Sequence, residues 1–198
     1  MSPAPTAPAT PPRPPLPGHY PAELERTWTP AGRAPVHLRA LRPDDIELEL
    51  RFVERLSADT LHLRIQSFAT EVSRRDLERL LDTDYVDRLG IGGFVHEDGV
   101  ETLVGVSRYA RIEGTTRAEC AIVVADDWQG CGLGTELMRS LAQAAIGRGF
   151  TCLEGDALAA NARLANWARR FGFKVRTEPY SGGLVKVTIE LEQLLPVQ

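Results

Sequence analysis

The sequence predicts a single α/β domain of the α+β kind, with a mixed, mostly antiparallel central sheet of about seven strands and helices on both faces. Three observations predict it. Strand-like and helix-like patterns alternate from Pro35 onward, Asp98-Gly99 separates two strand-like runs, and a glycine-rich stretch over residues 130–134 joins a strand-like run to a helix-like one. With 198 residues, of which 43% are hydrophobic, the chain is long enough to build one core.

The first 33 residues are expected to lie outside this domain, as a disordered tail rich in proline and alanine. Eleven of the fourteen prolines fall within the first 35 residues, where hydrophobic periodicity is missing. Such a segment favours extended polyproline II and buries no core. The domain is therefore expected to cover residues 34–198.

The first part of the domain has the pattern of one strand followed by three helices. The run VHLRAL, from residue 36, alternates like a strand, and apolar residues then recur at helical spacing behind Asp44, the expected N-cap. Two further helices are expected over residues 57–67 and 73–82, because each range begins with serine and continues with apolar periodicity.

The remaining elements are mostly strands. LGIGGFVHED and VETLVGVSRYARI flank Asp98-Gly99, a dipeptide typical of a tight hairpin, and TTRAECAIVVA is expected to run antiparallel to the second of them. Apolar residues at four-residue steps from Leu133 to Ala145 predict a one-faced helix that ends near Gly147. FTCLEGDAL follows as a strand, ANARLANWARRF as a helix opening at Asn161, and FKVRTE and GGLVKVTIEL as closing strands.

Composition and charge argue against several function classes. A net charge of −4 and a pI near 5.6 disfavour a nucleic-acid-binding surface. The apolar runs are far shorter than the roughly 20 residues that cross a bilayer, and the beginning of the chain lacks the apolar core of a secretory signal. Cys120, Cys131 and Cys152 lack CxxC spacing, and the histidines lie on separate elements. We therefore expect a cytoplasmic protein with free thiols, without bound metal, and without nucleic-acid or membrane partners.

Three glycines, Gly130, Gly132 and Gly134, stand at alternate positions at the mouth of a helix. No lysine follows them as a P-loop requires, and their GxGxG spacing does not fit the GxGxxG dinucleotide fingerprint. A pyrophosphate laid over backbone N–H groups at a helix N-terminus fits better, because those donors and the helix dipole favour an anion. The alternative is a tight strand-to-helix turn, but one glycine would be enough for a turn.

With Gln129 in front, the loop has the pattern Q-G-x-G-x-G, and here the sequence resembles the GNAT superfamily of N-acetyltransferases. The hallmark loop of that family, Q/R-x-x-G-x-G/A, lies between a strand and a long helix. The resemblance covers about residues 36–191 and includes Asn161 at a helix start and Gly172-Phe173 at its end. It implies a GNAT fold and acetyl-CoA as co-substrate, with the pantetheine arm between two splayed strands. The implied cofactor-binding residues are Val123, Val124, Gln129, Gly130, Cys131, Gly132, Leu133, Gly134, Thr135 and Asn161.

The stretch RAECAIVVADDWQGCGLGTEL resembles, more narrowly, bacterial protein lysine acetyltransferases that modify acyl-CoA synthetases. In that subgroup a strand glutamate at this place is the general base, which implies this role for Glu119, the only acid of its strand. Without the resemblance, Glu119 has the pattern of a solvent-facing residue paired with Arg108 or Arg111. The implied acceptor is a protein lysine, for example on an acyl-CoA synthetase. A small amine acceptor and a non-catalytic acyl-CoA-binding module are the alternatives.

The chain departs from the family at the residue that protonates the leaving thiolate. Many GNAT enzymes have a tyrosine four residues before the glycine of Gly-Phe, where this chain has Ala168. Tyr180 is a candidate replacement by its proximity in the sequence alone. Arg163, Arg169 and Arg170 are candidates for the 3′-phosphate of CoA, or else solvated helix charges.

Overall fold

The computed structural model of the chain describes residues 19–64, 72–177 and 182–194. Five α-helices and eight strands lie within these ranges. The helices are α1 (Ile46–Glu54), α2 (Ala58–Arg64), α3 (Arg74–Leu81), α4 (Leu133–Gly147) and α5 (Ala162–Phe171). The strands are β1 (Arg26–Trp28), β2 (Val36–Ala40), β3 (Arg88–Glu97), β4 (Val100–Arg111), β5 (Arg117–Val124), β6 (Cys152–Leu158), β7 (Lys174–Thr177) and β8 (Leu184–Glu190).

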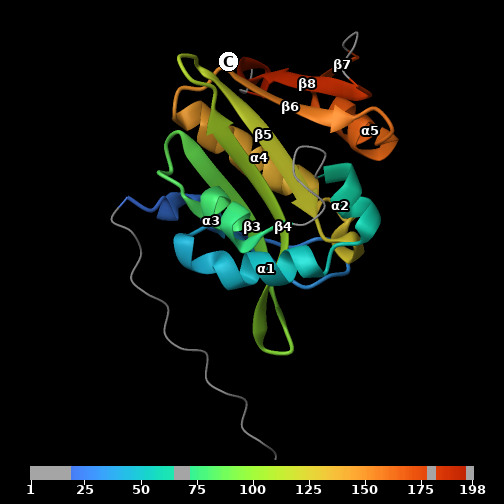
Figure 1. Cartoon of the computed structure of the whole chain (residues 1–198). Helices are drawn as coiled ribbons and strands as arrows, with labels where there is room; N and C mark the ends of the chain where they lie inside the picture. Colours follow the sequence, from blue (N-terminus) through green and yellow to red (C-terminus); the bar gives the residue numbers. More distant parts are fainter. Residues whose placement is uncertain (1–18, 65–71, 178–181, 195–198) are drawn as a thin grey trace, which may run out of the picture.

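The strands form one sheet in the order β1-β2-β3-β4-β5-β6-β8-β7 (Figure 1). Neighbouring strands are antiparallel except β5 and β6, which are parallel. This confirms the mixed, mostly antiparallel sheet that the sequence predicts. The strand beyond the expected seven is β1, which lies inside the segment expected to be a tail.

Helices cover both faces of the sheet (Figure 1). The helix α4 packs on the face that carries Ser107, whose hydroxyl donates to the carbonyl oxygen of Leu137 at 3.0 Å. The helix α1 packs on the opposite face, where Arg108 forms an ion pair with the buried Glu49. Burial raises the pKa of the Glu49 carboxyl, while the Arg108 guanidinium opposes the rise. Within the described ranges, no helix is both long and apolar enough to cross a bilayer.

The described part of the expected tail, residues 19–33, packs on the domain, which differs from the prediction of a tail up to residue 33. Tyr20 is buried against Tyr85, and β1 pairs with β2. Arg26 of β1 donates to Glu136 Oε2 at 2.8 Å on α4. Aromatic and charged side chains scattered among prolines thus make contacts that composition does not reveal. Residues 1–18 lie outside the described residues.

Local signals for turns and helix starts are mostly confirmed. Asp98 and Gly99 have φ values of 51° and 80°, as a tight two-residue hairpin turn requires. Ser73 caps α3 by accepting from the backbone N–H of Asp76. The expected cap Asp44 is wrong by one residue, because Asp45 occupies the N-cap of α1. Its buried carboxylate is held by the Arg39 guanidinium at 2.7 and 2.8 Å, a long-range contact that helical spacing does not predict.

Candidate active site

The strands β5 and β6 pair over a short distance and then separate. Their parallel register ends at the pair Glu119 and Glu154, and the later residues of β5 have no partner in β6. Gly155 lies at the point of separation, where a Cβ would stand 2.6 Å from the carbonyl oxygen of Cys120. Only glycine therefore allows the two backbones to approach so closely before they part. The separation leaves one edge of β5 open, as expected from the family resemblance.

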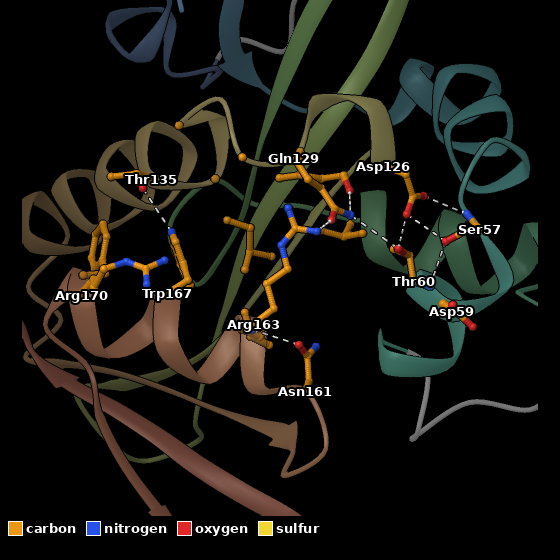
Figure 2. A pocket seen from close by; sticks show the side chains of 18 residues that line it. Ser57, Asp59, Thr60, Asp126, Gln129, Thr135, Asn161, Arg163, Trp167 and Arg170 are labelled. Atoms are coloured by element: carbon orange, nitrogen blue, oxygen red, sulfur yellow. Dashed lines mark hydrogen bonds between the residues drawn. The ribbon is translucent and has the colours of Figure 1, made fainter.

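A pocket of about 610 Å³ opens at this edge (Figure 2). Its sides are the end of β5, the glycine loop (residues 129–135), the first and last turns of α5, and the first turn of α2 with the preceding serine. Eight of the ten residues expected to bind the cofactor line it: Val123, Val124, Gln129, Gly130, Gly132, Gly134, Thr135 and Asn161. Their role in binding remains a prediction, but the structure brings them together.

The three glycines of the loop are required for different structural reasons. Gly130 and Gly132 have φ values of +81° and +98°, a backbone conformation that other residues rarely adopt. Gly134 is helical, and a Cβ there would lie 3.5 Å from the Ile122 side chain, at the surface of the pocket. Gly130 and Gly132 thus allow the backbone turn that leads into α4, where unpaired N–H groups at the helix N-terminus favour an anion.

Two of the expected cofactor-binding residues, Cys131 and Leu133, do not line the pocket. The Cys131 sulfur lies 3.0 Å from the carbonyl oxygen of Trp128, and Leu133 is buried in the core. Sequence position placed both within the loop, but it did not tell on which side of the loop their side chains lie. Trp128, just before the loop, is also buried, with the Arg33 guanidinium over its ring, and it does not line the pocket.

A chain of hydrogen bonds runs along the mouth of the pocket, from α5 to α2 (Figure 2). Arg163 Nη1 donates to Gln129 Oε1 at 2.6 Å, and Gln129 Nε2 donates to the Val124 carbonyl at 3.0 Å and reaches Thr60 Oγ1 at 3.5 Å. The Thr60 hydroxyl donates to Asp126 at 2.7 Å. Partial burial opposes ionisation of Asp126, but hydrogen bonds from Ser57 and Thr60 outweigh it and lower the pKa of this carboxyl.

Asn161 has two roles that are compatible. Its side-chain oxygen accepts from the backbone N–H of Leu164 at 2.9 Å, which caps α5, and the residue also lines the pocket. Six residues after Asn161 along the chain, Trp167 Nε1 donates to Thr135 Oγ1 at 3.1 Å and links α5 to α4. Trp167 therefore belongs both to the aromatic packing of α5, with Phe171, and to the pocket lining.

Glu119 lies exposed on β5 at the last residue pair before the strands separate, beyond the pocket lining. Its expected alternative partners are engaged elsewhere: Arg108 pairs with Glu49, and Arg111 donates to Asp87 at 2.7 Å. Within the described residues, the Glu119 carboxylate forms no hydrogen bond or ion pair. It is therefore accessible at the end of the open β5 edge, and its role as a base remains a prediction.

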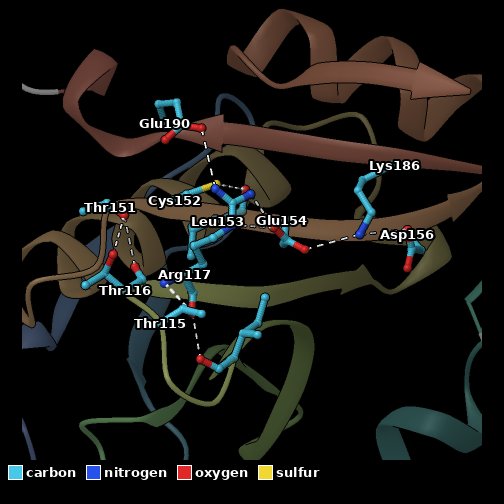
Figure 3. A network of polar contacts seen from close by, with 11 residues as sticks. Thr115, Thr116, Arg117, Thr151, Cys152, Leu153, Glu154, Asp156, Lys186 and Glu190 are labelled. Carbon is cyan, nitrogen blue, oxygen red and sulfur yellow. Dashed lines mark hydrogen bonds and ion pairs between the residues drawn. The ribbon is translucent and has the colours of Figure 1, made fainter. Parts of the chain in front are cut away.

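Beside Glu119, a polar network joins β5, β6 and β8 (Figure 3). Glu154 accepts from Arg117 Nε at 2.9 Å and from Lys186 Nζ at 3.3 Å. The hydrogen bond from Arg117 and the charge of Lys186 lower the pKa of the Glu154 carboxyl, although partial burial opposes them. This network depends on the order of the strands in the sheet, which no local sequence pattern predicts.

The structure offers no side chain at position 168 that can protonate a thiolate. Ala168 is buried, and Tyr180 lies outside the described residues. Ser57, Thr60 and Asp126 also line the pocket, although the sequence did not predict it. The only local signals were the position of Asp126 just before the loop and the spacing of Ser57 and Thr60 at a helix start.

The family profile that matches this chain and two relatives of known sequence are all acetyltransferases. The sequence profile of the acetyltransferase (GNAT) family matches residues 58–173. An acetyltransferase of Pseudomonas aeruginosa is 38% identical over 144 residues, which cover 73% of this chain and 77% of that protein. Acetyltransferase Pat of Mycolicibacterium smegmatis is 36% identical over 107 residues, which cover 53% of this chain and only 31% of Pat.

Solved structures show the same fold. The GNAT domain of PAT from S. lividans superposes with a TM-score of 0.78 at 24% identity, over 86% of this chain and 99% of that domain. The PaiA N-acetyltransferase of Thermoplasma acidophilum, solved in complex with coenzyme A, has a TM-score of 0.64 at 17% identity, over 78% of this chain and 98% of PaiA.

Proposed function

Because the chain belongs to the GNAT family of acetyltransferases, which use acyl-CoA, we propose that it transfers an acetyl group from acetyl-CoA to a protein lysine side chain. An acyl-CoA synthetase is the proposed type of acceptor. The observation that carries the proposal is the pocket in which the open edge of β5, the glycine loop and Asn161 meet. The similarity to Pat over 107 residues supports a protein acceptor.

The pocket fits an acyl-CoA by its shape and donors. The N–H groups of the glycine loop at the start of α4 would hold the pyrophosphate, and the open backbone of β5 next to Val123 and Val124 would pair with the amides of the pantetheine arm. A bound acetyl-CoA supplies an activated thioester. The Arg163 guanidinium adds a positive charge beside Gly130, where phosphate oxygens would lie.

Glu119 is proposed as the general base. A lysine side chain has a reference pKa near 10.4, so it arrives protonated at neutral pH and must lose a proton before it can attack. The Glu119 carboxylate is exposed, lies next to the separation of β5 and β6, and forms no hydrogen bond or ion pair with another described residue, so it is suited to accept that proton. Because Ala168 has no proton to give, we propose that the thiolate leaves without a side-chain acid of this kind.

Mass spectrometry tests the proposal. The protein is incubated with acetyl-CoA and a set of purified acyl-CoA synthetases, and acetyl-lysine is mapped on them, with thiol release recorded in parallel on polyamines, aminoglycosides and amino acids. Acetyl-lysine that requires the enzyme is expected on at least one synthetase. Brisk thiol release with small amines and none with proteins would contradict the protein acceptor. Tight CoA binding without transfer to any amine would favour a non-catalytic binding module.

A further inference from the structure

The first turn of α2 is attached to the glycine loop by one carboxylate. Asp126, three residues before Gln129, accepts from the Ser57 backbone N–H at 2.9 Å, from the Ser57 hydroxyl at 2.8 Å and from the Thr60 hydroxyl at 2.7 Å. Thr60 is in turn within 3.5 Å of Gln129 Nε2. One side chain next to the cofactor loop therefore accepts three hydrogen bonds from the start of a helix that is distant in sequence (Figure 2).

The pocket has opposite charges on its two sides. The α5 side carries Arg163 and Arg170, whereas the α2 side carries Asp59. Of the side chains in the described ranges, none forms an ion pair with Asp59. The phosphates of an acyl-CoA match the α5 side, and the ammonium group of an amine acceptor matches the α2 side.

The helix α2 also contacts β6, the strand that pairs with β5 as far as Glu119. The start of α2 borders the pocket, and the helix contacts the strand that leaves β5 beyond Glu119.

We propose that Asp126 is a positioning residue that holds α2 against the glycine loop, so that α2 forms the side of the pocket that binds the acceptor amine. This inference rests on the proposed function. In it, Asp126 contacts neither substrate. Its carboxylate acts through Ser57 and Thr60, and its loss should weaken binding of the amine while leaving the loop able to bind CoA.

Calorimetry on dead-end complexes tests the proposal without turnover. CoA is titrated into wild-type protein and into Asp126→Ala, and the lysine analogue Nα-acetyl-lysinamide is then titrated into each CoA-saturated protein. We expect the Kd for CoA to change less than about twofold and the Kd for the lysine analogue to rise at least fivefold, the size of effect that losing a charge-assisted hydrogen bond produces. The neutral Nα-acetyl-norleucinamide should not bind measurably.

Asp127→Ala is the matched control. Asp127 is adjacent, also exposed, and its carboxylate pairs with Arg55 at 2.8 Å rather than with α2, so both dissociation constants should stay at wild-type values. As a second pair, Thr60→Val should weaken amine binding as Asp126→Ala does, and Thr60→Ser, which keeps the hydroxyl, should restore most of it.

The outcomes separate this proposal from the proposed function. Equal affinity for the lysine analogue in wild type and Asp126→Ala, or an equal loss of CoA and amine binding, would overturn the positioning role. Failure of the wild type to bind the analogue would overturn the assignment of α2 to the amine. Amine binding that depends on Asp126, together with no transfer to any amine, would leave this inference standing and contradict the proposed function.

Discussion

Arg163 lies with its guanidinium next to the glycine loop, where a hydrogen bond fixes its position. Its guanidinium donates to Gln129 at 2.6 Å, and its Nη2 would lie 3.8 Å from a Cβ on Gly130. An anion on the loop would replace Gln129 as its partner, which would convert a hydrogen bond between a cation and a neutral amide into an ion pair with phosphate. The neighbouring cation Arg169 differs, because it donates to Asn166 and does not line the pocket.

We predict that Arg163→Ala raises the Kd for CoA about tenfold, the equivalent of roughly 1.4 kcal/mol, because one charge-assisted contact to phosphate is lost. The measurement is calorimetric titration with CoA at low and high salt. The difference from wild type should shrink as salt screens the phosphate. Arg169→Ala is the control and should bind like wild type; an equal loss in both variants would mean that Arg163 contributes only to the general charge of α5.

At the scale of single residues, the sequence predicted backbone roles better than side-chain partners. The glycines and Asn161 were found because turn geometry and helix capping depend on a few consecutive residues. The bonds of Asp126 to Ser57 and Thr60 join segments nearly 70 residues apart, and no local pattern encodes them.

Among the elements, the junction of β5, β6 and β8 depends on a polar residue. Glu154 is largely buried, with 16% of its side chain exposed, and it bonds Arg117 on one side and Lys186 on the other. The folded state therefore favours the ionised carboxylate, and the pKa of Glu154 lies below its ordinary value of 4.5. Such a group stabilises the fold above its unfolded pKa, and the contribution is lost as the pH falls through the folded pKa.

We predict that Glu154→Gln lowers the free energy of unfolding by about 1 kcal/mol at pH 7, and that the difference from wild type vanishes as the pH falls below the ordinary value of 4.5 and through the folded pKa. Urea unfolding at several pH values measures it. Asp156→Asn, on the same strand but 52% exposed and 3.8 Å from Lys186, should have a smaller effect. A difference that persists unchanged at pH 3 would contradict this electrostatic account.

The kinds and order of the elements were predictable because hydrophobic periodicity, the Asp98-Gly99 hairpin and serine caps are local signals. The separation of β5 and β6 was expected only through the family resemblance. Gly155 marks this separation by its close approach to the Cys120 carbonyl. That role cannot be inferred from the sequence unless β5 and β6 are known to be neighbours.

For the whole molecule, residues 19–34 are part of the folded unit. Tyr20 is buried, Trp28 lies 3.5 Å from a Cβ on Gly132, and Arg26 bonds α4. The segment thereby supports the glycine loop from outside the pocket. The proline-rich composition of this segment did not indicate that it packs on the domain, because only a few side chains make these contacts.

We predict that a chain beginning at residue 35 melts about 5–10 °C below one beginning at residue 19, since apolar burial of Tyr20 and Trp28 is lost. Both chains lack residues 1–18, so the comparison isolates the anchored segment. Thermal unfolding followed by circular dichroism measures it, and CoA should bind more weakly to the shorter chain because the loop loses its support. Equal melting temperatures of the two chains would show that the stable domain begins at residue 34, as the sequence predicted, and would contradict this account.

The central claim is that this pocket holds acetyl-CoA and that Glu119 takes the proton of the acceptor amine. The most direct measurement compares the rate of acetyl transfer by wild type and Glu119→Gln with saturating acetyl-CoA and lysine acceptor, alongside the Kd for CoA. We predict that kcat falls at least about 100-fold while the Kd for CoA stays within twofold. The control Glu113→Gln, at an exposed turn residue, should keep the wild-type rate. A Glu119→Gln variant that transfers acetyl groups as fast as wild type would contradict the account.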